Sequence, residues 1–168
     1  MHLEPIPDHL QAGLKILFVG FNPSIRSSET GYHYANPNNR FWKILHEAGL
    51  TPRKFAPYET RELLELGFGL TNIVERPTRE AAEISKEEYK KGAALLREKI
   101  EVYRPNAVCF VGKGVYKEFS HKRKIDWGVQ KDPVVPGTLE FVAPSSSGLV
   151  RIQLNDIVDV YRGLNKYI

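Results

Sequence analysis

A mainly apolar stretch near the start of the chain, followed at once by a turn, restricts the fold more than any other feature. Residues 14–19, Leu-Lys-Ile-Leu-Phe-Val, have the length and composition of a buried strand. Gly-Phe-Asn-Pro-Ser at residues 20–24 then predicts a sharp turn, because Gly and Pro interrupt regular structure. Open α/β sheets bind their ligands beyond the carboxyl ends of the strands. The stretch therefore predicts a polar side chain, Asn22, at a ligand-binding crevice.

Strand-like and helix-like segments alternate along the rest of the chain. Short apolar runs indicate strands, and helical spacing of apolar residues with capping signals such as Ser85-Lys86-Glu87-Glu88 indicates helices. This alternation predicts a three-layer α/β/α fold with a short, mainly parallel sheet of four strands. We expect strands at residues 14–19, 69–74, 107–111 and 139–143, and helices at residues 38–48, 59–66, 85–103, 112–119 and from 154 onward.

Polar residues follow each predicted strand, and we expect them to meet in one crevice. They are Asn22, Asn72, Lys113 and Ser145. A loop that would face the same crevice reads Gly-Tyr-His-Tyr-Ala-Asn-Pro-Asn-Asn-Arg-Phe-Trp at residues 31–42. Aromatic rings and amides in a cleft suit a planar, hydrogen-bonding ligand such as a nucleobase.

The composition is that of one globular domain. The chain has 168 residues, 42% of them hydrophobic, so we expect a single domain over residues 1–168 with residues 1–13 as a short lead-in. A net charge of +4 permits a nucleic-acid partner without requiring one. The sequence has no signal-peptide pattern and no apolar run of membrane length, which favours the cytoplasm and no membrane partner. No feature of the sequence indicates an oligomer, so we expect a monomer.

The sequence gives no indication of a metal, cofactor or nucleotide site. Cys109 lies in an apolar run and is expected in the core, and a single Cys excludes a disulfide within the chain. The five histidines lack metal-ligand spacing. Gly112-Lys113-Gly114 does not fit a phosphate-binding P-loop, and Ser146 does not lie in a G-x-S-x-G nucleophile turn. We therefore expect no metal and no cofactor.

Four segments of the sequence occur in a characteristic order. They are Gly-Phe-Asn-Pro-Ser at 20–24, the loop at 31–43, Thr-Asn-Ile-Val-Glu-Arg-Pro-Thr at 71–78, and Pro-Ser-Ser-Ser-Gly-Leu-Val-Arg at 144–151. Together they resemble the motifs of the mismatch-specific uracil/thymine DNA glycosylases, the second family of the uracil-DNA glycosylase superfamily, and the likeness extends from Leu14 to Tyr161. The resemblance implies a base-excision repair enzyme that removes uracil, and also thymine or other deaminated bases, opposite guanine in double-stranded DNA.

The resemblance also implies which residues surround the target base. Asn22 would hold the water that attacks the sugar carbon C1′, and Tyr34 would stack on the flipped base. The other base-site residues that it implies are Gly20, Phe21, Ser24 and Ser145, the first two through their backbone.

A second group of residues is implied to contact the DNA strands. Gly148, Leu149 and Arg151 match the wedge that fills the space left by the flipped base. Val150 stands where the family has a polar wedge residue. The remaining implied DNA contacts are Asn72, Ser146 and Ser147.

An Asn in the first motif restricts the chemistry. Most glycosidases flank the scissile bond with two carboxylates, whereas Asn22 can orient a water but cannot act as an ordinary general base. Catalysis would then depend on stabilising the departing base in a dry pocket, and mismatched pairs would be preferred because they open more easily. The first motif contains no Lys for a Schiff base, so we expect no lyase activity. Glu29 is a candidate to assist the water.

Alternative interpretations stay open at the level of sequence. A glycosylase for hypoxanthine or xanthine, a non-catalytic module for mismatched or abasic DNA, and a nucleoside hydrolase each fit part of the pattern. Of the two loop tyrosines, we expect Tyr34 rather than Tyr32 to enter the pocket. Structural roles compete as well: an Asx-turn for Asn22, a loop hydrogen bond for His33, a structural pairing for Arg40, a helix cap for residues 145–147, and a solvated charge run at residues 121–124.

Overall fold

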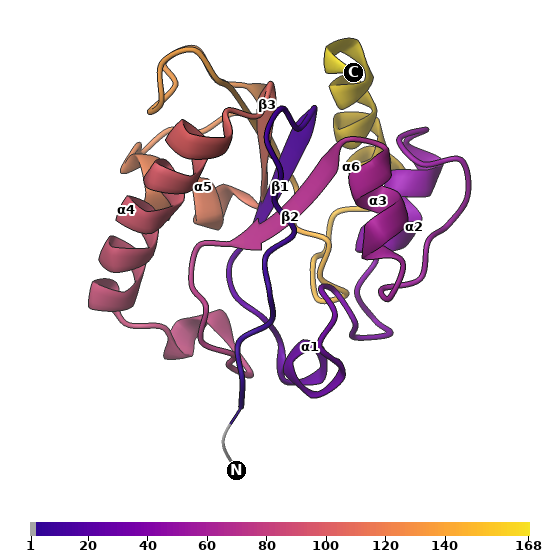
Figure 1. Cartoon of the computed structure of the whole chain (residues 1–168), viewed down its shortest axis with the longest axis horizontal. Coiled ribbons are helices and arrows are strands. Elements are labelled where there is room, and N and C mark those ends of the chain that lie inside the picture. Colours follow the sequence, from indigo (N-terminus) through magenta and orange to yellow (C-terminus); the bar gives the residue numbers. More distant parts are fainter. Residues whose placement is uncertain (1–2) are drawn as a thin grey trace.

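The computed structural model describes residues 3–168, in which five strands form one central sheet (Figure 1). The strand order is β2-β1-β3-β5-β4. The first four strands in that order are parallel, and the short β4 pairs antiparallel with β5 at the edge of the sheet. The strands are β1 Ile16–Gly20, β2 Phe68–Asn72, β3 Ala107–Val111, β4 Gly128–Val129 and β5 Leu139–Ala143.

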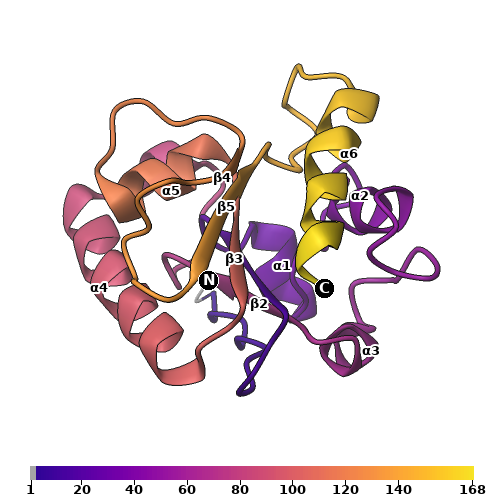
Figure 2. The same cartoon turned by 90° about the horizontal axis from the view of Figure 1, so that it is seen from above.

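Helices cover both faces of the sheet, which is clearest in Figure 2. α4 and α5 pack on one face, whereas α2, α3 and α6 pack on the other. α1 lies beyond the carboxyl end of β1 (Figure 1). The helices are α1 Ile25–Thr30, α2 Phe41–Glu47, α3 Thr60–Glu65, α4 Lys86–Tyr103, α5 Lys113–Ser120 and α6 Leu154–Arg162, with 3-10 turns η1 Ala81–Glu83 and η2 Gly163–Tyr167.

The sheet separates the apolar residues into two cores, because side chains alternate along each strand. In β1, Ile16 and Phe18 face α2, α3 and α6, whereas Leu17 and Val19 face α4 and α5. All five residues of β1 are buried. A strand that is covered on both faces needs an apolar side chain at nearly every position, and such runs can be recognised in the sequence.

The predicted three-layer fold with a mainly parallel sheet is confirmed, but within residues 3–168 the sheet has five strands rather than the predicted four, because the short β4 adds to its edge. The capping box of α4 also forms as predicted: Glu88 N donates to Ser85 Oγ at 3.1 Å, and Ser85 N donates to Glu88 Oε1 at 3.1 Å. These two contacts satisfy backbone N–H groups at the start of the helix, where no intrahelical partner exists.

Some elements differ from the prediction in ways that have local causes. β4 has only two residues, too few to produce a sequence pattern. α1 was not predicted; Ser24 caps it by accepting a hydrogen bond from Ser27 N at 3.1 Å. α2 begins at Phe41, later than expected, because residues 36–39 form a turn in which Asn39 N donates to Asn36 O at 2.9 Å. Phe41 N then donates to Asn39 Oδ1 at 3.0 Å. Within residues 3–168, no helix is long and apolar enough to span a bilayer.

The segment at residues 3–13, expected as a lead-in, runs along the edge of the sheet at β2. His9 and Leu70 exchange two backbone hydrogen bonds of 2.9 and 3.0 Å in an antiparallel bridge. Asp8 accepts from Thr71 Oγ1 at 2.7 Å and from Lys99 Nζ at 2.6 Å. We call this segment the N-terminal strap; it covers β2 and reaches the site described next.

Candidate functional site

A pocket of about 630 Å³ opens at the carboxyl ends of the parallel strands. Its walls come from the loops that follow β1, β2 and β5, together with the loop that precedes α2. Three of the four residues predicted to meet in one crevice line it, namely Asn22, Asn72 and Ser145. Lys113 does not; it begins α5 and its Nζ lies 4.2 Å from the centre of the Trp127 ring.

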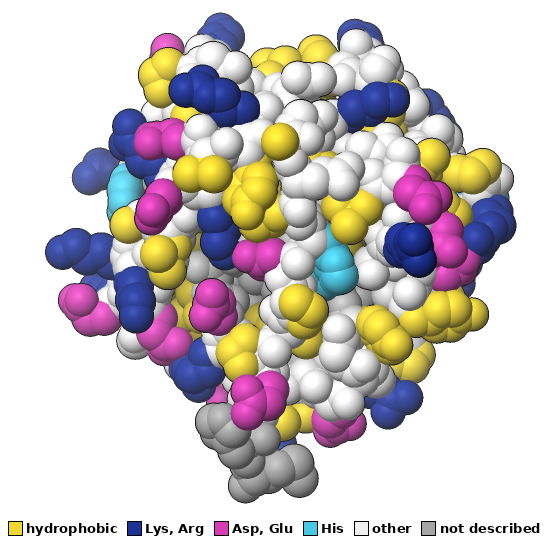
Figure 3. Space-filling model, viewed as in Figure 1, with side chains coloured by type: hydrophobic (Ala, Val, Ile, Leu, Met, Phe, Trp, Pro, Cys, Tyr) yellow, Lys and Arg dark blue, Asp and Glu magenta, His cyan; other side chains and the backbone are white. Residues whose placement is uncertain are grey.

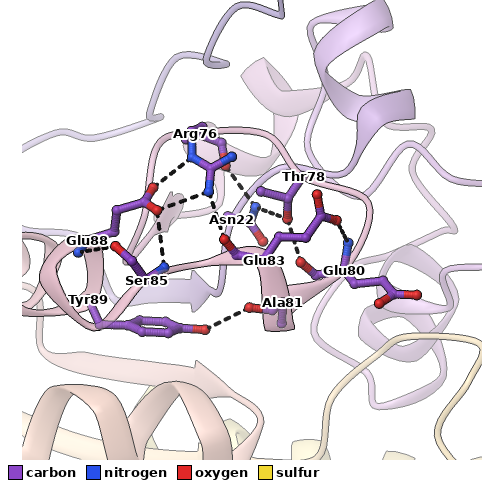
Figure 4. Close-up of polar contacts among 9 residues, drawn as sticks. All are labelled: Asn22, Arg76, Thr78, Glu80, Ala81, Glu83, Ser85, Glu88 and Tyr89. Carbon is purple, nitrogen blue, oxygen red and sulfur yellow. Dashed lines mark hydrogen bonds and ion pairs between the residues drawn. The ribbon is translucent and has the colours of Figure 1, made fainter.

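The Asn22 side chain is held in one orientation by two hydrogen bonds. Its Nδ2 donates to the backbone oxygen of Arg76 and to Thr78 Oγ1, both at 2.8 Å (Figure 4). Both amide hydrogens are therefore used, which distinguishes Nδ2 from Oδ1. Within residues 3–168, Asn22 Oδ1 receives no hydrogen bond. The side chain lines the pocket with a free acceptor, which is suited to binding a water.

The Thr78 hydroxyl helps to hold the Asn22 side chain in place. The Thr78 side chain is buried, and its hydroxyl accepts from Asn22 and donates to the backbone oxygen of Glu80 at 2.8 Å. Because the hydroxyl hydrogen is committed to Glu80, its lone pairs face Asn22 Nδ2. Thr78 N also donates to Pro23 O at 3.2 Å, which joins the loop after β2 to the turn after β1.

The Arg76 backbone is held by its own side chain. The guanidinium donates to the two carboxylate oxygens of Glu88 at 2.8 and 3.0 Å and to the backbone oxygen of Glu83 at 2.9 Å (Figure 4). The Arg76 hydrogen bonds lower the pKa of Glu88 to about 2. Glu88 also belongs to the capping box of α4. The Arg76 residue whose backbone oxygen orients Asn22 is therefore connected, through Glu88, to the amino end of the longest described helix.

The absence of a side chain at Gly20 leaves room for two polar groups on the floor of the pocket. Gly20 and Asn72 are paired at the ends of β1 and β2. A Cβ at Gly20 would lie 2.7 Å from Asn72 Oδ1 and 2.8 Å from the Tyr34 hydroxyl oxygen, closer than a real Cβ can approach. The missing side chain lets an amide and a phenol converge on the floor. Asn72, implied above as a DNA contact, thus borders the space where a base would lie.

Tyr34 lines the pocket and Tyr32 does not. The Tyr34 ring stacks on Phe41 with centroids 3.9 Å apart and an interplanar angle of 15°. Its backbone has φ of 52°, a left-handed conformation that is costly for a residue with a Cβ. Its hydroxyl is buried without a hydrogen-bond partner in residues 3–168, and this burial raises its pKa. Tyr32 is 40% exposed and packs edge-on against Tyr58.

The contacts of His33 indicate that it joins its loop to the N-terminal strap. Its side chain is buried, and its Nε2 lies 2.8 Å from the backbone oxygen of Pro7 in the N-terminal strap. Its ring meets that of His9 edge-on, with centroids 5.4 Å apart. Burial lowers the pKa of His33 to about 4, so the ring is neutral at pH 7 and donates to Pro7. This geometry favours the loop hydrogen bond over a catalytic role.

The loop at residues 145–149 forms the opposite rim of the pocket. Arg40 N donates to Ser146 O at 2.9 Å, and Arg40 Nη2 donates to Ser147 O at 3.2 Å. A Cβ at Gly148 would lie 2.6 Å from Asn38 O, so this loop and the loop before α2 pack backbone to backbone. Arg40 therefore makes a structural pairing with the loop at residues 145–149, and it also lines the pocket.

Leu149 is the exposed apolar residue at the pocket rim. It is 92% exposed, and the Ser147 hydroxyl accepts from its backbone N at 3.2 Å. Ser146, in contrast, is buried, and Arg151 is exposed but does not line the pocket. Val150 packs against the core formed by α2 and α6, away from the wedge position that the motif implies. α6 is preceded by Gln153 as its N-cap residue, so residues 145–147 do not cap it.

Several pocket residues were not found by sequence reasoning. Thr78, Arg79 and Glu80 follow β2, and Ile6 comes from the N-terminal strap. Thr78 is the last residue of the segment at 71–78 that carries the family resemblance. No local sequence pattern marks it as a hydrogen-bond partner of Asn22, which lies 56 residues earlier. Glu29, proposed to assist the water, is exposed on α1 and does not line the pocket. In residues 3–168, no group of three His, Cys, Asp or Glu side chains could hold a metal ion.

Replacing Tyr34 by Phe tests the cost of its unpartnered hydroxyl. We expect Tyr34→Phe to raise the free energy of unfolding by about 1 kcal/mol, because a buried hydroxyl without a partner is destabilising. Tyr34→Ala should lower stability by removing the stack on Phe41. Urea unfolding measures both, with Tyr32→Phe as the exposed control. Destabilisation by Tyr34→Phe would mean that the hydroxyl has a favourable contact.

The buried His33 predicts a loss of stability in mild acid. Its pKa is about 4 in the folded protein and 6.5 when exposed, so below pH 6.5 the unfolded chain binds a proton that the folded chain does not. Stability should be complete above pH 6.5 and fall towards pH 4, by a total on the order of 3 kcal/mol. Burial of His9 acts in the same direction, while Asp8 opposes both.

Unfolding experiments at pH 7 and near pH 4.5 measure this loss. His33→Gln keeps a donor for Pro7 O and cannot titrate, so it should lose clearly less stability than the wild type over this interval. His121→Asn, which replaces an exposed histidine, should behave as the wild type does. Equal losses in the wild type and His33→Gln would show that another group is responsible.

Comparison with known proteins agrees with this fold. The model of the uracil DNA glycosylase superfamily matches residues 7–166. A protein from Methanosarcina acetivorans, provisionally described as a uracil DNA glycosylase and solved by solution NMR, has a TM-score of 0.62 to this chain. The two are 23% identical over 98% of this chain and 99% of that one, which establishes similarity of fold. Because the family model covers nearly the entire sequence, the chain belongs to the uracil DNA glycosylase superfamily.

Proposed function

We propose that this protein is a mismatch-specific, monofunctional DNA glycosylase that releases uracil opposite guanine. Thymine and other deaminated bases are included as slower substrates. The observation that carries the proposal is the fixed Asn22 amide, which lines the pocket with Oδ1 as its free acceptor. The enzyme acts on double-stranded DNA as a monomer and uses no metal or cofactor.

In this mechanism the target nucleotide leaves the duplex and its base enters the pocket. Tyr34 supplies the stacking surface, since one face of its ring is already fixed against Phe41. The carbonyl oxygens of Gly20 and Phe21 accept from Ile73 N and Val74 N, both at 2.9 Å. Backbone N–H groups and the Asn72 amide are therefore the groups proposed to bind the base edge. We therefore assign Asn72 to recognition of the base, rather than to the contact with the DNA strands that the resemblance implied.

A water bound to Asn22 Oδ1 is the nucleophile. The bond between C1′ and the base breaks, and its electron pair leaves with the base. The water oxygen bonds to C1′ and releases a proton to solvent, which leaves an abasic site. Asn22 cannot accept that proton, so the rate depends on how well the pocket stabilises the departing anion. Uracil is a stable enough anion for such a catalyst.

Leu149 fills the stack that the flipped base vacates. An isolated apolar side chain that is 92% exposed costs free energy in water and becomes favourable when it inserts between bases. Among the described residues that line the pocket, Glu80 is the acidic one, and no hydrogen bond joins its carboxylate to Asn22. Base opening is proposed to limit the substrate range. Mismatched pairs are preferred because they are easier to open.

Single-turnover cleavage of end-labelled duplexes tests the proposed function. Duplexes carrying one G·U, A·U, G·T or C·hypoxanthine pair are treated with alkali to reveal abasic sites. We expect the fastest cleavage at G·U, and a loss of about 10²-fold or more in Asn22→Ala. Leu149→Ala should reduce cleavage by impairing base opening, and Asn155→Ala, an exposed amide on α6, is the matched control.

Each alternative outcome has a defined meaning. Fastest release of hypoxanthine would keep the chemistry but change the substrate to deaminated purines. Cleavage of free deoxyuridine would indicate a nucleoside hydrolase. Binding of mismatched duplexes without cleavage would contradict the enzyme proposal and leave a recognition module.

Thr78 is proposed to act through Asn22 rather than on the substrate. Thr78→Val keeps the shape but removes the acceptor for Asn22 Nδ2, so we expect the single-turnover rate to fall by about tenfold with DNA affinity unchanged. Thr78→Ser retains the hydroxyl and should restore most of the rate. An equal loss of affinity and rate in Thr78→Val would instead indicate a general disturbance of the pocket.

A further inference from the structure

A second concave surface lies beside the pocket and carries a concentrated positive charge. It has a volume of about 440 Å³ and is formed by α5, through Lys113, Gly114 and Lys117, and by the loop that follows this helix. We call it the basic hollow and define it by its four cationic residues, Lys113, Lys117, Arg123 and Lys124. Asp126 is the one acidic residue among the described residues that line it.

The cations of the basic hollow are not neutralised by neighbours. Within residues 3–168, their side chains form no ion pair and no hydrogen bond. All four are exposed. On the face seen in Figure 3, Lys and Arg are interspersed with Asp and Glu. Unpaired like charges around a concave surface repel one another, so an anionic ligand would stabilise them.

Lys113 is held within the basic hollow by an aromatic ring. Its Nζ lies 4.2 Å from the centre of the Trp127 ring, a cation–π contact that limits the side chain without neutralising it. Trp127 is 38% exposed. The charge at the amino end of α5 is therefore partly preorganised, which lowers the entropy lost when an anion binds.

The basic hollow shares a wall with the pocket. Gly114 lines the hollow, and a Cβ at this position would lie 2.6 Å from Phe21 Cζ. Phe21 lines the pocket on its other side. Because α5 begins directly after β3, the hollow lies, like the pocket, at the carboxyl ends of the parallel strands. A ligand too large for the pocket would extend over this surface.

We propose that the basic hollow binds backbone phosphates of the duplex next to the flipped nucleotide. The inference rests on the proposed function, which makes DNA the substrate, and adds a contact outside the base pocket and the Leu149 loop. Each DNA strand carries one phosphate per 3.4 Å of helix axis, so a duplex with one base in the pocket must place several phosphates near its walls. Lys and Arg contacts to phosphate are independent of sequence, as a repair enzyme requires.

Charge neutralisation with a matched control tests the proposal. Lys117→Gln/Lys124→Gln removes two charges from the basic hollow. The control variant, Lys15→Gln/Lys166→Gln, removes two exposed charges elsewhere. Lys15 precedes β1 at the amino ends of the strands, and Lys166 lies in η2. Binding of each full-length variant to a duplex with an uncleavable abasic-site analogue is measured over a series of salt concentrations.

We expect the hollow variant to bind about 10–100-fold more weakly than the wild type near physiological salt. Its plot of log affinity against log salt should be shallower by about 2, since each lost phosphate contact removes about 0.9 from the slope. The control variant should match the wild type. Cleavage at saturating protein should be unchanged in both variants, because neither pair of residues lines the base pocket.

Two results would overturn the proposal, and they are distinguishable. If the wild type binds DNA and both variants show its salt dependence, the basic hollow makes no phosphate contact although the glycosylase proposal stands. If the wild type binds neither damaged nor abasic duplexes, the glycosylase proposal fails and the phosphate site fails with it.

Discussion

The Asn22 amide depends on a contact between two loops that are far apart in sequence, and the rest of the site is arranged around it. Ile73 N and Val74 N donate to the carbonyls of Gly20 and Phe21, which continues the β1–β2 pairing beyond the strands themselves. This extended pairing brings Arg76 O and Thr78 Oγ1 to Asn22 Nδ2. Parallel pairing of the two strands therefore fixes the orientation of the side chain on which the proposed chemistry depends.

The sequence predicted those parts of the molecule whose signals are local. Buried parallel strands are apolar throughout, so 107–111 and 139–143 could be identified with their observed limits, and the capping box at Ser85 fixed the start of α4. The hydrogen bonds of Asn22 to Thr78 and of His33 to Pro7 join residues 56 and 26 positions apart, and no local pattern encodes them. The same reason explains why Lys113 was placed in the wrong cavity: its turn was predicted, but its contact with Trp127 was not.

The pocket contains features that reduce stability and that a simple core would avoid. Tyr34 has a positive φ and a hydroxyl that has no hydrogen-bond partner within residues 3–168, and a Cβ at position 20 would lie under 3.0 Å from the present positions of the Asn72 and Tyr34 side chains. Stacking on Phe41 offsets part of this cost and holds the ring in place before any base arrives. Strain that is concentrated where a ligand would bind is typical of a preorganised site.

The distribution of charge says more about the partner than the net charge does. A total of +4 in 168 residues is compatible with many functions. Several arginines are neutralised by acids, as in Arg76–Glu88, Arg97–Glu101 and Arg162–Asp159, so these side chains add little to the field around the protein. The cations of the basic hollow have no such partners among residues 3–168, and they lie next to the pocket at the carboxyl ends of the strands. The excess positive charge is thus placed where a phosphate backbone would pass if the pocket receives a flipped base.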